Sequence, residues 1–186
     1  MPYETVTPDR LRRFLERLAR EYRRPGKVYL VGGTGLLYQG LKAATKDVDL
    51  STNLPASSAD EFTQALRRLR NELQMAIEEV SPADFIPLPR GVEERHRYLG
   101  RAGQLEIFAF DPVSTALAKL ARSRVQDIED VLVLLQEGQL TLDALDTAFE
   151  EIIPRVAASK ALKITEDEFR VKFTLFKEIA ALRGLA

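Results

Sequence analysis

The sequence predicts an α/β protein of the α+β kind, with a small mixed-sheet core and a C-terminal helical extension. Short apolar, β-branched runs alternate with segments of helical spacing as far as residue 110. From residue 111 onward the pattern is helical. At 186 residues the chain is long enough to bury a substantial core. We therefore expect residues 1–110 to form an α/β core with an N-terminal helix, and residues 111–186 to form a helical region.

The first expected helix begins at Pro8-Asp9 and ends before Pro25-Gly26. Five apolar side chains recur along it at helical spacing and form one stripe, which predicts packing against a core. These side chains are Leu11, Phe14, Leu15, Leu18 and Tyr22.

A strand, a turn, a helix and a second strand follow in close succession. The apolar run 27–31 predicts a strand, which Gly32-Gly33 interrupts. Residues 34–40 predict a short helix with Thr34 near its N-terminus, and residues 47–51 predict the next strand.

The rest of the predicted core contains one helix and two strands. The pattern Ser58-Ala59-Asp60-Glu61 is typical of a capping box and predicts a helix through about residue 73. Residues 75–80 and 104–110 predict strands, and the segment 81–91, with three prolines, predicts a loop. The segment 93–103 is ambiguous.

Helical periodicity governs the C-terminal region. Asp111 is a favourable N-cap and Pro112 suits a first helical turn, so a helix is expected to begin there. We expect four helices, at about 112–123, 126–137, 141–158 and 165–183.

Composition restricts the kinds of site that the chain can hold. No apolar stretch is long enough to cross a membrane and no N-terminal signal pattern is present, so we expect a cytoplasmic protein without a membrane partner. The absence of Cys excludes disulfides and thiolate ligands, and a single His, His96, argues against an imidazole metal site. A bound metal would therefore need oxygen ligands. His96 itself is expected on the surface rather than in acid–base chemistry.

The net charge of −1 conceals an uneven distribution. Residues 1–27 carry eight basic and four acidic side chains, whereas residues 125–154 carry eight acidic side chains and no basic ones. Such polarity often accompanies a nucleic-acid or partner surface, although two solvated helix surfaces explain it equally well.

The segment Asp47-Val48-Asp49-Leu50 carries the clearest chemical signal. Residues at i and i+2 of a strand point to one face, so Asp47 and Asp49 are expected to present two carboxylates together. Adjacent carboxylates repel unless a cation lies between them, and hard oxygen ligands suit Mg²⁺ or Mn²⁺ shared with substrate phosphates. The N–H groups of the Gly32-Gly33 turn, with the Thr34 hydroxyl, are expected to hold those phosphates.

This order of a strand, a Gly-Gly turn, a helix and an Asp-x-Asp strand resembles the signature of the polymerase-beta-type nucleotidyltransferases. The resemblance implies an enzyme that transfers a nucleoside monophosphate from a nucleoside triphosphate to an acceptor hydroxyl. In this superfamily a third carboxylate on a later strand often completes the metal site. Glu106 is the carboxylate in the later strand here, which makes it the candidate third ligand.

Lys119 is followed by Asp127 and Asp130, which share a helix face at i, i+3. Together they resemble later motifs of the AbiEii-type nucleotidyltransferases of type IV toxin–antitoxin systems and their small relatives, over about residues 27–135. The resemblance implies that Lys119 contacts nucleotide phosphates and that Asp127 orients Lys119 or acts on the acceptor. Thr34 stands where many relatives have Ser and keeps the hydroxyl.

The resemblance also implies partners. A tRNA 3′ end, a protein hydroxyl and a small molecule are the acceptor candidates, and a cognate antitoxin is an expected binding partner. The general base stays open between Glu106, Asp127 and a second metal ion.

Simpler interpretations stand beside these. The Asp47–Asp49 pair would also suit a polar strand edge, and the glycines a tight turn. Lys119 and Glu106 would also suit solvent-exposed positions, and Asp127 and Asp130 a helix N-terminus favoured by the macrodipole. A non-catalytic nucleotide-binding or protein-interaction module, for example an antitoxin-like one, is the alternative function.

Overall fold

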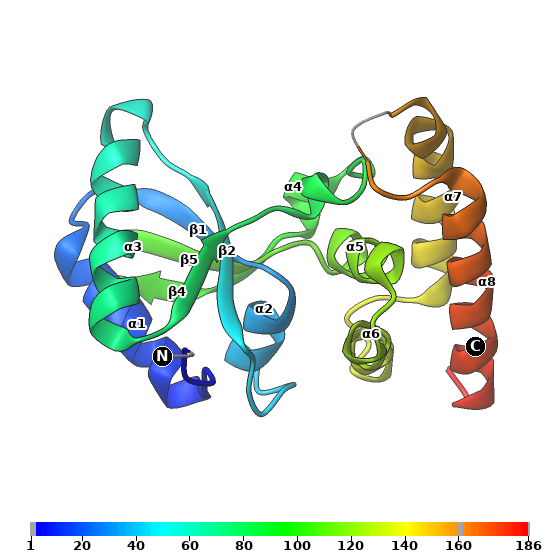
Figure 1. Cartoon of the computed structure of the whole chain (residues 1–186), viewed down its shortest axis with the longest axis horizontal. Coiled ribbons are helices and arrows are strands. Elements are labelled where there is room, and N and C mark those ends of the chain that lie inside the picture. The colour runs from blue at the N-terminus through cyan, green and yellow to red at the C-terminus, as the bar shows by residue number, and fades with distance from the viewer. Residues whose placement is uncertain (1–2, 160–161, 186) are drawn as a thin grey trace. The chain divides into compact units, whose positions relative to one another are not determined.

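The computed structural model describes residues 3–159 and 162–185, which divide into two compact units (Figure 1). The first unit runs through Val80 and resumes at His96–Phe110. The second unit contains Ser81–Arg95 and the chain from Asp111 onward. The first is an α+β unit and the second is helical, which confirms the predicted α+β class. Among the described residues, no helix has both the length and the apolar character needed to cross a bilayer.

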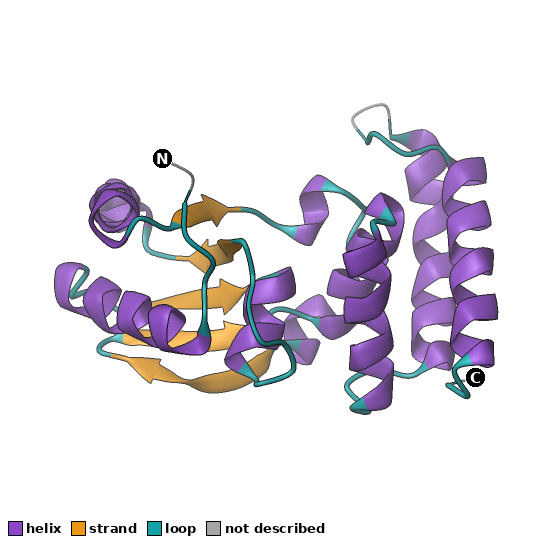
Figure 2. Cartoon of the chain, turned by 60° about the horizontal axis from the view of Figure 1, so that its bottom comes forward, coloured by secondary structure: helices purple, strands orange, loops and turns teal. Residues whose placement is uncertain are grey.

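A five-stranded mixed sheet forms the centre of the first unit (Figure 2). Its order is β3-β2-β1-β5-β4; β1 pairs in parallel with β5 and antiparallel with β2, while β3 is parallel to β2 and β4 is antiparallel to β5. The strands are β1 Gly26–Leu30, β2 Asp47–Asn53, β3 Ala76–Glu79, β4 Arg97–Ala102 and β5 Leu105–Ala109. The ambiguous segment 93–103 therefore contains β4, with a bulge between Tyr98 and Gly100.

Helices α1 (Pro8–Glu21) and α3 (Ala59–Leu73) contact one another and supply the core of this unit, while α2 (Gly32–Tyr38) connects β1 to β2. The predicted apolar stripe of α1 is buried against alternate residues of the sheet. The core residues of the strands include Val28, Leu30, Val48, Leu50 and Ile107.

Helix α3 begins where the sequence predicts, but its capping box is absent. Ser58 is the N-cap residue and makes no side-chain capping bond, so this prediction was wrong. A 3-10 turn, Ala56–Ser58, precedes the helix. The Ser58 hydroxyl instead donates to the carbonyl of Pro55 at 2.9 Å and lies 2.8 Å from the buried Tyr22 hydroxyl. A tertiary partner has therefore replaced the local one.

The second unit begins with a 3-10 turn at Pro82–Asp84 and the short helix α4 (Val92–Arg95). The four predicted helices follow as α5 Pro112–Arg122, α6 Val125–Gln136, α7 Leu142–Ala158 and α8 Glu166–Leu182. Asp111 caps α5 as predicted, because its carboxylate accepts hydrogen bonds from the N–H groups of Val113 and Ser114.

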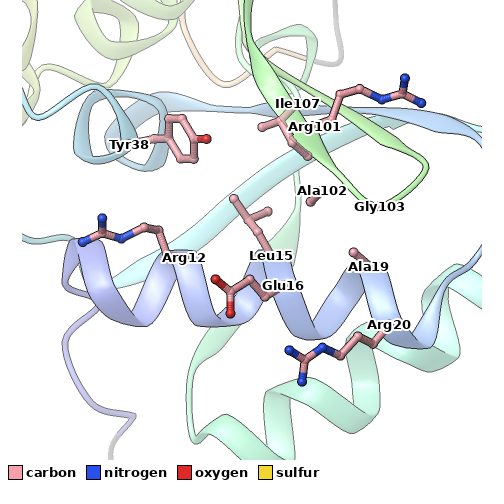
Figure 3. Close-up of a pocket in the computed structure, with 10 residues that line it drawn as sticks. All are labelled: Arg12, Leu15, Glu16, Ala19, Arg20, Tyr38, Arg101, Ala102, Gly103 and Ile107. Atoms are coloured by element: carbon pink, nitrogen blue, oxygen red, sulfur yellow. The ribbon is translucent and has the colours of Figure 1, made fainter.

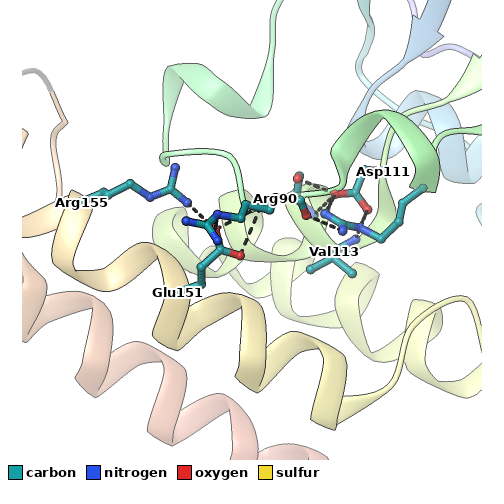
Figure 4. A network of polar contacts seen from close by, with 7 residues as sticks. Arg90, Asp111, Val113, Glu151 and Arg155 are labelled. Carbon is teal, nitrogen blue, oxygen red and sulfur yellow. Dashed lines mark hydrogen bonds and ion pairs between the residues drawn. The ribbon is translucent and has the colours of Figure 1, made fainter.

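Asp111 also joins α4 to α5 (Figure 4). Its carboxylate, which is fully buried, accepts two hydrogen bonds of 2.9 Å from the Arg95 guanidinium. The hydrogen bond to Asp111 raises the pKa of Arg95 above its ordinary value. In the same view Glu151 accepts hydrogen bonds from the Arg90 backbone N–H and from the Arg155 side chain. These contacts explain why Ser81–Arg95 groups with the helices rather than with the sheet.

Candidate functional site

Asp47 and Asp49 lie on one face of β2, opposite the core. The residues that alternate with them, Val48 and Leu50, are fully buried, whereas both aspartates are half-buried. Leu50 pairs with Leu30 of β1, and Ser51 pairs with Tyr29. The aspartates therefore share the face of the sheet that carries Tyr29, and α1 and α3 supply the core on the other face.

The turn beside these aspartates requires glycine at several positions. Gly32 has a φ of 56°, in the left-handed region that side chains rarely adopt. A Cβ on Gly33 would lie 2.8 Å from the Thr45 hydroxyl oxygen and 3.6 Å from the Lys42 amino group. A larger residue at Gly33 would therefore require the Thr45 side chain to shift.

Thr34 joins this turn to the aspartate strand. Its side chain is fully buried, and its hydroxyl oxygen accepts a 2.9 Å hydrogen bond from the Asp49 N–H. The same hydroxyl donates to the Asp47 carbonyl at 3.3 Å. One side chain therefore holds the backbone on both sides of Val48. The sequence predicts a phosphate contact for this hydroxyl, and the two bonds observed here go to the backbone of β2.

The sheet does not bring Glu106 to the aspartates. Glu106 pairs with Lys27 at the start of β1, whereas Asp49 accepts a hydrogen bond from Val31, beyond the end of β1. Four residues of strand separate the two levels, about 13 Å at about 3.3 Å per residue. Carboxylates that share one divalent cation lie within about 2–2.6 Å of it. The register therefore argues against Glu106 as the third ligand of an ion held by Asp47 and Asp49.

Glu78 is nearer in register to the aspartates than Glu106 is. It lies on β3, pairs with Asp49 in parallel register, and shares the aspartate face. The next residue, Glu79, pairs with Leu50 and points to the other face. The segment 75–80 predicts this strand, but its pairing with β2 depends on the fold.

The donor set at β2 fits a hard divalent cation, because carboxylate oxygens are the ligands that Mg²⁺ and Mn²⁺ prefer. Within the parts of the chain that the structure describes, no three acidic, histidine or cysteine side chains gather closely enough to hold a metal ion together. The two aspartates would thus share such an ion with substrate oxygens, as Mg²⁺ sites commonly do.

Lys119, Asp127 and Asp130 meet in the second unit. The Lys119 amino group donates to Asp127 at 3.3 Å and to Asp130 at 2.6 Å, and all three side chains are about 5 % exposed. Arg122 adds a 2.7 Å bond to Asp127, and Gln126 donates to Asp130 at 3.0 Å. Asp127 therefore contacts Lys119, and its role in orienting Lys119 toward a nucleotide stays a prediction.

This cluster is internally balanced, with two cations and two carboxylates. Breaking such a buried pair leaves an uncompensated charge and is strongly destabilising. The arrangement accounts for the spacing of Lys119 and the aspartates by stability alone, and a phosphate contact of Lys119 stays a prediction.

A pocket of about 500 Å³ lies on the opposite side of the sheet from the aspartates (Figure 3). It is bounded by α1, by Tyr38 and by the β4–β5 turn, and Ile107 reaches it from the core face. Gly103 in that turn has a φ of 59°, and a Cβ there would lie 3.1 Å from the Cβ of Ala19. The pocket is separate from the aspartate face.

One family model matches the chain, over residues 9–179, and is described as a nucleotidyltransferase of unknown function (DUF6036). No curated protein and no solved structure shows significant similarity to the chain. The family match covers most of both units and far more than half of the sequence. The chain therefore belongs to this family of nucleotidyltransferases of unknown function.

Proposed function

We propose that this protein is a Mg²⁺-dependent nucleotidyltransferase that joins a nucleoside monophosphate, taken from a nucleoside triphosphate, to an acceptor hydroxyl. One observation carries the proposal: two carboxylates share a face of β2, and a buried hydroxyl ties their backbone to a glycine turn. Family membership supports the same reaction class.

In this proposal the turn at Gly32-Gly33 binds the triphosphate. The first N–H groups of a helix have no partners within that helix, so they suit anionic oxygens. Thr34 keeps the turn and the aspartates in register through its two backbone bonds. The positioning of phosphates relative to carboxylates is what phosphoryl-transfer sites chiefly require.

Asp47 and Asp49 would hold the cation, and Glu78 on the neighbouring strand would add negative charge to the same face of the sheet. Bound there, Mg²⁺ would neutralise charge on the triphosphate while the acceptor hydroxyl displaces pyrophosphate from the α-phosphorus. The acceptor oxygen gains the phosphorus bond and loses its proton. Of the proton acceptors that the sequence leaves open, Glu106 is disfavoured by its distance along the sheet.

Lys119 has a secondary place in the proposal. Its amino group already has two carboxylate partners, so a phosphate would have to compete with Asp127 and Asp130. Lys119→Arg keeps the charge but changes its hydrogen-bond geometry. A phosphate role predicts a raised KM for the nucleotide in this variant at unchanged stability, whereas a purely structural role predicts lower stability and an unchanged KM.

The deciding experiment is a transfer assay with each of the four α-³²P ribonucleoside triphosphates, Mg²⁺, total tRNA and cell lysate. Asp47→Asn/Asp49→Asn removes the charges with little change of shape. Glu79→Gln is the matched control, because it removes a carboxylate from the other face of the adjoining strand. We expect label in RNA, protein or a small product with wild type and with Glu79→Gln, and none with the double variant.

A second measurement tests directly whether the aspartate variant has lost its cation site. Mn²⁺ binding, followed by electron paramagnetic resonance, should fall in Asp47→Asn/Asp49→Asn and stay unchanged in Glu79→Gln. Absence of label with every nucleotide, together with absence of cation-dependent nucleotide binding by calorimetry, would overturn the enzyme assignment in favour of a non-catalytic module.

We further propose, from the resemblance to AbiEii-type enzymes, that the activity is toxic in cells lacking a cognate antitoxin, with a tRNA 3′ end or a protein as acceptor. Induced expression of wild type should then arrest growth, and Asp47→Asn should not. Growth arrest that persists in the variant would exclude nucleotidyl transfer as its cause.

A further inference from the structure

Aromatic side chains line the aspartate face of the sheet across three strands. Tyr98 on β4 meets Phe108 on β5 edge to face, with ring centroids 5.4 Å apart. The Phe108 ring lies 5.5 Å from the ring of Tyr29 on β1, and the His96 ring lies 4.4 Å from that of Tyr29. Phe110 completes the group at 4.6 Å from His96. We call these five residues the aromatic row.

The register of the sheet joins the aromatic row to the aspartates. Tyr29 pairs with Ser51, which is the next residue after Asp49 on the same face of β2. Phe108 pairs with Tyr29 and with Tyr98, so a single line of cross-strand neighbours runs from Ser51 to the sheet edge. Tyr29 is buried between Phe108 and Ser51, so the accessible part of this line is its outer end.

The row is open at its outer end. Tyr98 is 57 % exposed and Phe108 is half-buried, whereas Tyr29 and Phe110 are buried. Packing within a core does not account for an aromatic ring so exposed on the edge strand, since burying apolar area is what stabilises core aromatics.

Positive charge borders the row on the side away from the aspartates. The Lys27 amino group lies 5.5 Å from the centre of the Phe108 ring. Lys27 and Arg101 flank Glu106 in direct register on neighbouring strands, and all three line a cavity of about 320 Å³. Two cations and one carboxylate leave this end with a net positive charge.

We propose that Tyr98, Phe108 and the basic end of the aromatic row bind a single-stranded segment of nucleic acid, with bases stacked on these two rings and phosphates near Lys27 and Arg101. Aromatic faces beside cations are how proteins hold unpaired polynucleotides without reading their sequence. The Phe108 and Tyr98 rings, with centroids 5.4 Å apart, offer separate contacts to two successive bases, which a single nucleotide cannot occupy at once.

The proposal deepens the function proposed above and rests on it for the identity of the bound strand, which would be the acceptor. The stacking contacts depend on the aromatic rings and not on the carboxylates, so nucleic-acid binding and nucleotidyl transfer can be measured separately. Glu106 acquires a different role from the one that the sequence predicts: it would weaken phosphate binding rather than hold a metal.

The absence of tryptophan from the chain offers a direct test. Tyr98→Trp places a single indole on the row, and stacking of a base should quench its fluorescence. Tyr3→Trp is the matched control, because Tyr3 is similarly exposed, at 48 %, and lies outside the row. Both are made in the Asp47→Asn/Asp49→Asn background and titrated without Mg²⁺ with an unstructured RNA octamer, the same RNA as a duplex, and ATP.

We expect saturable quenching of Tyr98→Trp by the single-stranded octamer, at least tenfold weaker binding of the duplex and of ATP, and no quenching of Tyr3→Trp. In anisotropy measurements on labelled octamer, Tyr98→Ala should weaken binding about 5- to 150-fold, in line with stacking energies of about 1–3 kcal/mol per base. Lys27→Gln should weaken it and flatten its salt dependence, whereas Glu106→Gln should strengthen it.

Equal quenching by ATP and by the octamer would overturn the polynucleotide assignment in favour of a mononucleotide site. Absence of quenching, with full transfer activity in Tyr98→Ala, would overturn the inference and leave the proposed function standing. Quenching by the octamer, together with absence of label transfer by the wild-type protein, would support the inference and overturn the proposed function.

Discussion

Thr34→Val tests whether the buried hydroxyl positions the aspartate strand. Valine keeps the shape of the side chain but offers no hydrogen bond to the Asp49 N–H or to the Asp47 carbonyl, which lie 2.9 and 3.3 Å from the hydroxyl oxygen. Leaving a buried polar group unsatisfied costs about 1–3 kcal/mol. Because the longer bond is the weaker one, we expect a total loss of about 2–3 kcal/mol in the free energy of unfolding.

Urea denaturation measures this loss, and thermal melting should show it as a decrease of about 5–10 °C in Tm for a chain of this length. Thr34→Ser is the matched control, since it keeps both hydrogen bonds and loses one buried methyl group. That deletion should cost about 1 kcal/mol. The difference in stability between the two variants gives the contribution of the hydroxyl, separate from that of side-chain packing.

Metal binding supplies an independent readout of the same residue. If Thr34 positions the carboxylates, Mn²⁺ affinity should fall in Thr34→Val and be retained in Thr34→Ser. A Thr34→Val protein with wild-type stability and wild-type Mn²⁺ affinity, but weaker nucleotide binding, would refute this reasoning. It would favour instead the phosphate contact that the sequence predicts.

Three further predictions concern the surrounding framework, and denaturant titration measures each of them. Asp111→Ala removes the cap of α5 and the partner of Arg95, and should cost about 2–4 kcal/mol; a loss below about 1 kcal/mol would contradict this role. Gly33→Ala should cost about 1–3 kcal/mol by crowding the Thr45 hydroxyl, and Thr45→Ala in the same chain should recover most of the loss; equal losses in the single and double variants would exclude this contact as the cause. Lys119→Met leaves two buried aspartates with one fewer cation and should cost about 3–5 kcal/mol, whereas wild-type stability would show that the cluster is not structural.

Local patterns predicted most of the elements of this fold. The stripe on α1, the cap at Asp111 and the alternation around Val48 each depend on residues within a few positions of one another. The wrong prediction of a capping box at Ser58 has a non-local cause. Its hydroxyl is within reach of a local cap and also of Tyr22, 36 residues earlier, and the tertiary contact prevails.

Some residues of the candidate site can likewise be predicted from local sequence, and others cannot. Asp47, Asp49 and Gly32 can be predicted from the sequence because side-chain alternation and a left-handed φ angle are local requirements. Glu106 and Glu78 are both strand carboxylates, and no local feature separates them. The strand order places Glu78 beside Asp49 and Glu106 about four residues away.

The sequence by itself determined the α+β class, the strand–turn–helix–strand segment and the paired carboxylates, because periodicity and glycine conformation depend on residues that are close together in the chain. Only the tertiary structure decided which side chains accompany those carboxylates. Cross-strand neighbours such as Glu78, and the aromatic row on β1, β5 and β4, come from segments far apart in the chain. Their proximity follows from strand order and register, which the burial of a whole sheet face selects.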